Sequence, residues 1–269
     1  MPPREDSNTM YHSLPEAQWR GLIRQLRERT SLWRTELLLG LVIVALAATV
    51  LHVVTKVPAT VFGTSLFVYL LIVFTVLYHA PSFPGQSGPG PANRVTFLRA
   101  ALIVPVAALI LHPAHLDADT TYWLLALATL ALLLDGVDGA VARRTGSITR
   151  FGARFDMELD ALLIMALAIL VWQTGQAGIW VLLIGLMRYL FVAAGWRWQW
   201  LENDLPPSRR RQTICVVQSV ALLVALVPLV PSGFAGAIAL GALLVLTYSF
   251  IVDIRWLYLA HHRYARDSR

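Results

Sequence analysis

The chain has 269 residues, of which 57% are hydrophobic and only 14% are charged, whereas an ordinary soluble domain has about 45–50% and about 25%. Together with a mean hydropathy of +0.62, this composition excludes a soluble globular enzyme and an intrinsically disordered chain. The single cysteine, Cys215, excludes a disulfide framework and a cysteine metal site. The net charge of +6 is compatible with a nucleic-acid partner or an anionic membrane surface, and the positions of the arginines must decide between them.

The first 35 residues contain arginines and acidic residues ahead of any long apolar stretch, which is not the pattern of a signal peptide. The apolar residues of this segment fall on or near one face of a helix, with arginines opposite: Trp19, Leu22, Ile23, Leu26 and Trp33. We therefore expect an amphipathic helix that lies on the inner leaflet of a membrane. An exposed helix without a function is the alternative.

Eight apolar stretches follow in chain order, at about 37–55, 58–78, 96–112, 121–140, 156–174, 178–196, 214–230 and 233–254. A helix needs roughly 20 residues to cross a membrane, and none of the stretches alternates with the period of two that is typical of a barrel strand. The sequence therefore predicts an all-α, polytopic bundle of eight membrane helices.

The basic residues indicate an orientation for this bundle. If the N-terminus is cytoplasmic, 20 of the 22 lysines and arginines lie in cytoplasmic segments, and the only lysine, Lys56, lies outside them. This is the positive-inside pattern. We therefore expect a multi-pass protein of a bacterial-type inner membrane with both termini in the cytoplasm, and no nucleic-acid partner.

A linker divides the predicted bundle. Residues 80–92 contain four prolines and three glycines, too many for a helix. The predicted domains are a cytoplasmic amphipathic segment at 1–35, a two-helix membrane extension at 36–79, the linker at 80–92, a six-helix membrane domain at 93–258, which we expect to be catalytic, and a basic cytoplasmic tail at 259–269.

Five of the sixteen acidic residues fall in the short window from Asp135 to Asp160. The purely apolar parts of the helices on either side are too short to cross a membrane alone, so these carboxylates are expected within the inner part of the bilayer. Asp135 and Asp138 share one helix face, as do Asp156 and Asp160 on the next helix. A short turn around 145–149 would fold the two helices antiparallel and bring the four aspartates together, with Glu158 pointing elsewhere.

Four ionised aspartates at this depth would repel one another and would be costly to desolvate. Divalent cations remove that difficulty, and carboxylate oxygens favour Mg²⁺ or Mn²⁺. Two ions would clamp both oxygens of a displacement at phosphorus. Gly139 and Ala142 leave room on the same face for a ligand, and Arg143 offers a fork for a diphosphate. A set of helix caps and surface charges at a hairpin is the alternative.

The residues Asp135-Gly-Val-Asp138-Gly139-Ala-Val-Ala142-Arg143, followed after eight residues by Gly152-Ala-Arg-Phe-Asp156-Met-Glu-Leu-Asp160, resemble the signature of the CDP-alcohol phosphatidyltransferase family. Asn93, Thr96 and Arg99 resemble the short element at the start of that family's first core helix. The resemblance covers about residues 93–256. It implies a six-helix core, to which the two N-terminal membrane helices and the amphipathic helix are additions.

The resemblance also implies a function. Members of the family transfer the phosphatidyl group of a CDP-linked donor, usually CDP-diacylglycerol, to a small alcohol, release CMP, and are commonly homodimers. By this resemblance, Asp135, Asp138, Asp156 and Asp160 would hold two Mg²⁺ or Mn²⁺ ions at a cytoplasmic active site, and Asp160 would be the catalytic base. The residues expected to bind the donor are Asn93, Thr96, Gly139, Ala142, Arg143, Thr149 and Gly152.

The arginines in the sixth span and before the seventh span have two interpretations each. Arg188 lies in the middle of the sixth span, where it could face the acceptor or pair with a core aspartate. Arg209, Arg210 and Arg211 could bind an acceptor phosphate or anchor the seventh span. Asp253 is expected to be a cap at the membrane interface, and Cys215 a small packed residue.

Two other functions remain possible from the sequence alone. The buried aspartates could serve a transporter coupled to divalent cations or protons. The chain could also be a catalytically inactive scaffold of the same fold, although an intact signature argues against this. The sequence does not identify the acceptor alcohol.

Overall fold

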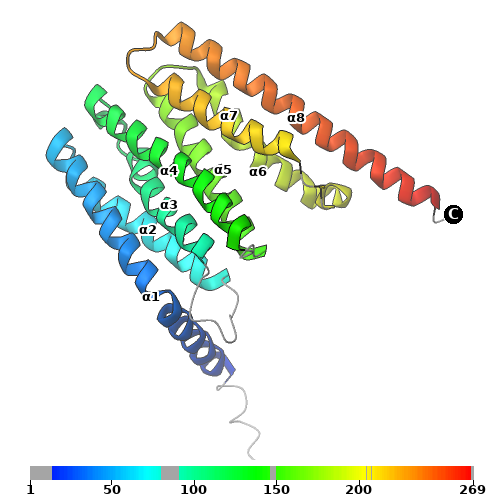
Figure 1. Cartoon of the computed structure of the whole chain (residues 1–269), viewed down its shortest axis with the longest axis horizontal. Helices are drawn as coiled ribbons and strands as arrows, with labels where there is room; N and C mark the ends of the chain where they lie inside the picture. Colours follow the sequence, from blue (N-terminus) through cyan, green and yellow to red (C-terminus); the bar gives the residue numbers. More distant parts are fainter. Residues whose placement is uncertain (1–13, 80–90, 146–149, 204, 207, 268–269) are drawn as a thin grey trace, which may run out of the picture.

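The computed structural model describes the backbone of residues 14–79, 91–145, 150–203, 205–206 and 208–267, and the side chains within 34–78, 94–137, 152–203, 205–206 and 208–262. These residues form eight α-helices and three short 3-10 helices, with no strand among them (Figure 1). The predicted all-α bundle is thereby confirmed. The α-helices are α1 (Leu14–Thr55), α2 (Thr60–His79), α3 (Pro91–Leu109), α4 (Ala118–Thr145), α5 (Arg150–Gln173), α6 (Leu182–Arg197), α7 (Arg209–Leu226) and α8 (Ser232–Asp267).

The helix ends differ from the apolar stretches mainly at the two ends of the chain. The segment expected to be a separate amphipathic helix and the first span form one continuous helix, α1. No proline interrupts this segment after the first helical turn, so nothing in the sequence ends the helix before Thr55. The last helix, α8, likewise continues past the apolar stretch through most of the basic tail.

Five of the helices are long and apolar enough to cross a membrane, and the spans are Arg34–Thr55, Thr60–Tyr78, Ala118–Val137, Ile179–Arg197 and Ser232–His262. The other three, α3, α5 and α7, carry charged residues near their first turns. Two of these helices bury polar side chains against their neighbours: α3 buries Thr96 and Arg99, and α7 buries Gln218 and Ser219. Their polar residues therefore serve contacts between helices.

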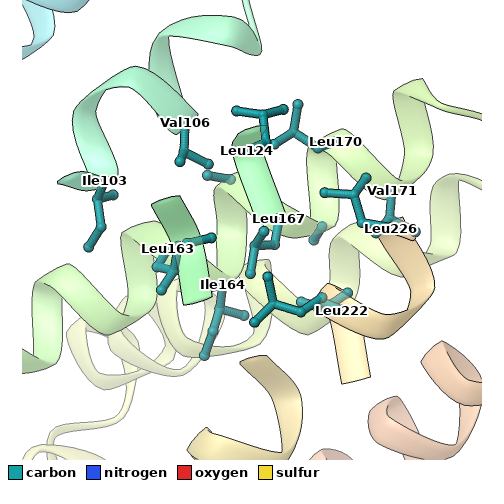
Figure 2. Close-up of a cluster of buried hydrophobic side chains, with 14 of the residues drawn as sticks. Ile103, Val106, Leu124, Leu163, Ile164, Leu167, Leu170, Val171, Leu222 and Leu226 are labelled. Carbon is teal, nitrogen blue, oxygen red and sulfur yellow. The ribbon is translucent and has the colours of Figure 1, made fainter. Parts of the chain in front are cut away.

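The main hydrophobic core lies between α3, α4, α5 and α7. Figure 2 shows Ile103 of α3, Leu124 of α4, Leu167 of α5 and Leu222 of α7 around one buried volume. Helix α6 packs on the outside of α5 through Gly185, where a Cβ atom would lie 2.7 Å from the Cα atom of Met165. Helix α5 is therefore held from several sides, which fixes the position of the aspartates near its first turns.

The N-terminal pair α1–α2 packs against α3 rather than standing apart (Figure 1). Tyr69 of α2 donates its hydroxyl to the Leu37 carbonyl at 2.5 Å, and its ring meets Phe97 of α3 edge to face. Glu36 of α1, almost buried, pairs with Arg94 of α3 at 2.8 Å. The extension therefore forms a lateral cover over the first core helix.

Helix α3 buries residues on two of its faces, and each face belongs to a different hydrophobic cluster. Phe97, Ala101 and Val104, spaced at i, i+4 and i+7, belong to the cluster that α1 and α2 complete. Arg99 lies on a different face with Ile103, which belongs to the main core. One helix thus connects the N-terminal pair to the interior of the bundle.

Candidate active site

Three aspartates from two helices meet at one point. Asp135 lies on α4, and Asp156 and Asp160 lie one turn apart on α5. One carboxylate oxygen from each of the three falls within 4.8 Å of the others. The three side chains are the aspartate cluster of this chain. Helix α3 packs against both α4 and α5, and this packing places the three carboxylates at one point, whereas residues 146–149, around the predicted turn, lie outside the described residues.

A buried arginine occupies the centre of the aspartate cluster. The guanidinium of Arg99 is fully buried, and its Nη1 atom pairs with Asp135 at 2.9 Å and also with Asp156. Its Nη2 atom donates to Asp160 Oδ1 at 2.7 Å. Its Nε atom donates to the carbonyl of Ala131 at 3.2 Å, one turn before Asp135 on α4. Arg99 therefore joins α3, α4 and α5 through one planar fork.

The cluster is sealed on one side and open on the other. The Arg99 side chain is 0% exposed, whereas the side chains of Asp135, Asp156 and Asp160 are 24%, 36% and 24% exposed. A fourth helix, α7, also approaches the cluster: the Sγ atom of its Cys215 lies 3.7 Å from the Oδ2 atom of Asp160. The carboxylates therefore present oxygens to an accessible space, and this arrangement suits a cation that must also reach a ligand.

Hard oxygen ligands of this kind fit Mg²⁺ or Mn²⁺. The fit rests on the donor set alone, because all three groups are carboxylates and lie close enough to share an ion. A guanidinium at the same point shows that the carboxylates need positive charge beside them.

Several of the residues predicted to bind the metal ions or the CDP-linked donor lie at or beyond the edge of the described residues. Asn93 lies in α3 and Asp138, Gly139, Ala142 and Arg143 lie in α4, but their side chains are outside the described residues; Thr149 is outside them altogether. Of the other predicted donor residues, Thr96 and Gly152 are both buried. Thr96 precedes Arg99 by one turn of α3, and Gly152 precedes Asp156 by one turn of α5.

Glu158 points away from the cluster, as expected, and it is the ion-pair partner of Arg188. Arg188 of α6 pairs with Glu158 across the α5–α6 contact, and both side chains are partly exposed. Of the two interpretations of Arg188, the pair with a core aspartate is therefore wrong, because its partner is this glutamate on the other side of α5.

The basic residues at the start of α7 are engaged by one buried carboxylate. Arg210 and Arg211 both pair with Asp253 of α8, and Arg210 also donates to the Ser249 carbonyl at 3.0 Å. Arg209 is exposed at the first position of the helix. The expectation that Asp253 caps a helix is wrong. It lies well inside α8, where its carboxylate, 11% exposed, ties α7 to α8.

Two residues of the site were not assigned from the sequence. Arg99 was noted only for its resemblance to a family element, and Cys215 only as a packed residue. The signal for Arg99 was present, because a charged residue inside an apolar helix marks a candidate functional site, as it did for Arg188. No sequence signal placed Cys215 beside Asp160.

A hollow of about 210 Å³ lies away from the aspartate cluster, between α1 and α3. It is lined by Thr35, Glu36, Leu39, Gly40, Arg94, Phe97 and Leu98. These α3 residues lie on the face turned toward the N-terminal pair, and Arg99 lies on the other. The hollow therefore belongs to the contact of the extension, not to the cluster.

Comparison with known proteins identifies a family and a relative of this chain. The family model described as CDP-alcohol phosphatidyltransferase matches residues 91–251, more than half of the chain. An archaetidylinositol phosphate synthase from Aeropyrum pernix is 48% identical over 61 residues, which are 23% of this chain and 31% of the relative. The matched segment therefore spans less than a third of that relative's length. No solved structure matches the chain.

Proposed function

The chain belongs to the CDP-alcohol phosphatidyltransferase family, as its motif predicted, and from this premise we propose that it transfers a phosphatidyl group from CDP-diacylglycerol to a small alcohol, with release of CMP. The observation that carries the proposal is the aspartate cluster, in which carboxylate oxygens from α4 and α5 lie within 4.8 Å of one another. Ionisable residues inside a membrane protein are functional candidates by default, and three carboxylates that converge in this way suit a cation-dependent reaction.

The membrane location suits a lipid donor. Five helices long and apolar enough to span, together with the family, indicate an integral membrane protein. We propose that the cluster and both termini face the cytoplasm of a bacterial-type inner membrane, because 20 of the 22 basic residues would then lie on the cytoplasmic side. A CDP-linked lipid would then place its diphosphate beside the aspartates while its chains stay in the bilayer.

Asp135, Asp138, Asp156 and Asp160 are the residues that we propose to hold two Mg²⁺ or Mn²⁺ ions. Such ions, when bound, supply charge stabilisation for the diphosphate and for the leaving phosphate. Hard carboxylate oxygens fit this role, and the described part of the cluster contributes three of the four groups.

The remaining chemistry falls to side chains of the chain. An uncharged hydroxyl is a weak nucleophile, so a positioned carboxylate must take its proton. We propose Asp160 for this role: the acceptor oxygen forms a bond to the phosphorus that carries the diacylglycerol, and the bond from that phosphorus to the bridging oxygen breaks. CMP leaves with the bridging oxygen and its electron pair, and the hydroxyl proton passes to Asp160.

The donor's nucleotide and diphosphate are proposed to contact residues along the same helices. These residues are Asn93, Thr96, Gly139, Ala142, Arg143, Thr149 and Gly152. Small residues leave space for the nucleotide beside α4 and α5, and an arginine is suited to bind a diphosphate in a bidentate manner.

For the acceptor, the proposal centres on the start of α7. Arg188 is paired with Glu158, and Arg210 and Arg211 are paired with Asp253, so an acceptor phosphate would compete with these carboxylates. Arg209 is exposed at the first residue of α7. We therefore propose Arg209 as the arginine that first meets a phosphate on the acceptor. The name of the archaeal relative suggests inositol phosphate as one acceptor to test.

We also propose that residues 93–258 form the catalytic membrane domain. The other segments are additions to it: the amphipathic segment 1–35, the two-helix extension 36–79, the linker 80–92 and the tail 259–269. We further propose that the protein works as a homodimer. The packing of α1 and α2 on α3 supports an extension that covers the core from the side.

The test is CMP release by the purified protein. CDP-diacylglycerol and Mn²⁺ or Mg²⁺ are supplied with glycerol 3-phosphate, serine, inositol, inositol phosphate or choline, one at a time. We expect CMP with one acceptor, and none with the Asp160→Asn variant. If no acceptor yields CMP but liposomes containing the protein take up Mn²⁺, a transporter replaces the enzyme. If neither occurs, the chain is a scaffold.

A further inference from the structure

Arg99 contacts the same carboxylates to which the proposed function assigns the divalent ions. Its guanidinium reaches the Oδ1 atoms of Asp135, Asp156 and Asp160, and it is fully buried. We infer that Arg99 is a positioning residue: it is the built-in cation that holds these carboxylates together before the ions bind, and it opposes the binding of those ions. This inference rests on the proposed metal binding by the aspartate cluster.

The orientation of the guanidinium supports this role. Its Nε atom donates to the Ala131 carbonyl, which fixes the plane of the group against α4. The two Nη atoms then point to Asp135 on α4 and to Asp156 and Asp160 on α5. A lysine has a single nitrogen and could not hold three carboxylates on two helices in this way. The fork of Arg99 therefore sets the distance between the two halves of the site.

The charges explain why the cluster still requires ions. Among the described residues, three carboxylates contact one guanidinium, so the negative groups outnumber the positive one in this partly exposed site. Each carboxylate has two oxygens, and Arg99 uses Oδ1 of each. A divalent ion would share the carboxylates with a positive group already present, and like charges at close range repel. Arg99 should therefore stabilise the metal-free protein while it weakens metal binding.

This assignment differs from that of a buried ion pair that only supports the fold. A purely structural arginine would stabilise the metal-free and metal-loaded proteins equally. A built-in cation stabilises the metal-free protein more, since the ions take over part of its role. By linkage, such a coupling must appear as a change in metal affinity when Arg99 is removed.

The experiment measures thermal unfolding of the full-length protein in detergent micelles without substrate. The protein is first freed of metal with a chelator, and Mn²⁺ alone is then added in increasing concentration. For Arg99→Met, we expect a lower melting temperature without metal and a larger metal-induced rise. The half-saturating Mn²⁺ concentration should fall by about fivefold or more. An unchanged or higher half-saturating concentration would overturn the assignment.

Arg210→Met is the matched control. Arg210 also pairs with a buried carboxylate, but its partner is Asp253 on α8 instead of the cluster. We expect this variant to melt at a lower temperature with no change in the half-saturating Mn²⁺ concentration. If it binds Mn²⁺ more tightly to the same extent as Arg99→Met, the effect is a general loss of rigidity and the assignment fails.

Arg99→Lys keeps the inference testable if the methionine variant does not fold. Lysine keeps the charge, but its single nitrogen cannot contact all three carboxylates, so part of the cluster is released to the ions. We therefore expect an intermediate melting temperature and Mn²⁺ binding that is tighter than in the wild type. Binding equal to or weaker than that of the wild type would refute the role of the fork. If Mn²⁺ does not raise the melting temperature of the wild type, the metal site itself fails, and this inference fails with it.

Discussion

Arg99 and Asp160 are 61 positions apart in the chain, yet Nη2 of Arg99 donates to Oδ1 of Asp160 at 2.7 Å. This bond ties the first core helix, α3, to the helix that carries two of the three clustered aspartates. Because the same guanidinium also holds Asp135 of α4, the relative positions of three helices determine the geometry of the site.

Asp156→Asn and Asp160→Asn should each lower the rate of CMP release by orders of magnitude. Each change removes a carboxylate charge beside the proposed metal site, and Asp160→Asn also removes the proposed base. Glu158→Gln should change the rate little, because Glu158 faces Arg188 on the far side of α5. Rates measured at saturating CDP-diacylglycerol check this. Equal losses in all three variants would show that the two faces of α5 are assigned wrongly.

Gly40→Ala should destabilise the protein by about 1–3 kcal/mol, which is typical of overpacking. A Cβ atom at this position would lie 2.7 Å from the Tyr69 hydroxyl and 3.0 Å from the Phe97 ring. The Tyr69 hydroxyl has little freedom to move, since it is bonded to the Leu37 carbonyl.

The control is Gly63→Ala on α2, where no atom lies within 4 Å of the new Cβ. This variant should be as stable as the wild type or slightly more stable, because alanine favours a helix. The stabilities of the two variants are compared by thermal unfolding. If Gly40→Ala were as stable as Gly63→Ala, α1 would not be packed on Tyr69 and Phe97 as the structure has it.

Asp253→Asn should lower the free energy of unfolding by about 1.5–3 kcal/mol, the range for hydrogen bonds to charged groups. The carboxylate is nearly buried and holds both Arg210 and Arg211. Glu158→Gln breaks an exposed pair and should cost below about 1 kcal/mol. Denaturation of the two variants side by side measures the difference, and similar costs would contradict the burial of Asp253.

Asp117→Ala should destabilise α4 by about 0.5–2 kcal/mol, because Asp117 caps the helix by accepting a hydrogen bond from the Thr120 backbone amide at 2.9 Å. The Thr120 side chain and backbone amide hold the pKa of Asp117 below its ordinary value of 3.8. The depressed pKa makes this contribution fully present above about pH 4. It is lost as the pH falls through the lowered value.

The measurement is the difference in melting temperature between the wild type and Asp117→Ala, taken from pH 7 down to pH 3. The difference should be constant at neutral pH and should shrink below about pH 4. A difference that grows on acidification would show that the cap does not depend on the ionised carboxylate.

The helical architecture and the shared face of the two aspartates on α5 could be predicted from the sequence, because both depend on local spacing. Apolar stretches of near-constant length give the eight helices, and the i, i+4 spacing of Asp156 and Asp160 gives their shared face. Glu158, two positions from each, had to point elsewhere. Its contact with Arg188 agrees with that expectation.

The contacts between distant helices could not be predicted in the same way. Nothing in the spacing of Arg99 on α3 says which helices lie opposite it, so its three partners depend on tertiary packing. Asp253 was misjudged for the same reason: a lone acidic residue near the end of an apolar stretch resembles a cap until Arg210 and Arg211 are seen beside it. Cys215 came near Asp160 only because α7 packs on α5.

Helix α1 is continuous over 42 residues. At 1.5 Å per residue it is about 63 Å long, roughly twice the hydrocarbon thickness of a bilayer. Its N-terminal part must therefore extend beyond the acyl chains, while its membrane part rests on α3 through Glu36 and Gly40. A binding event at its outer end would therefore act on the same continuous helix that packs against α3, the helix that holds Arg99.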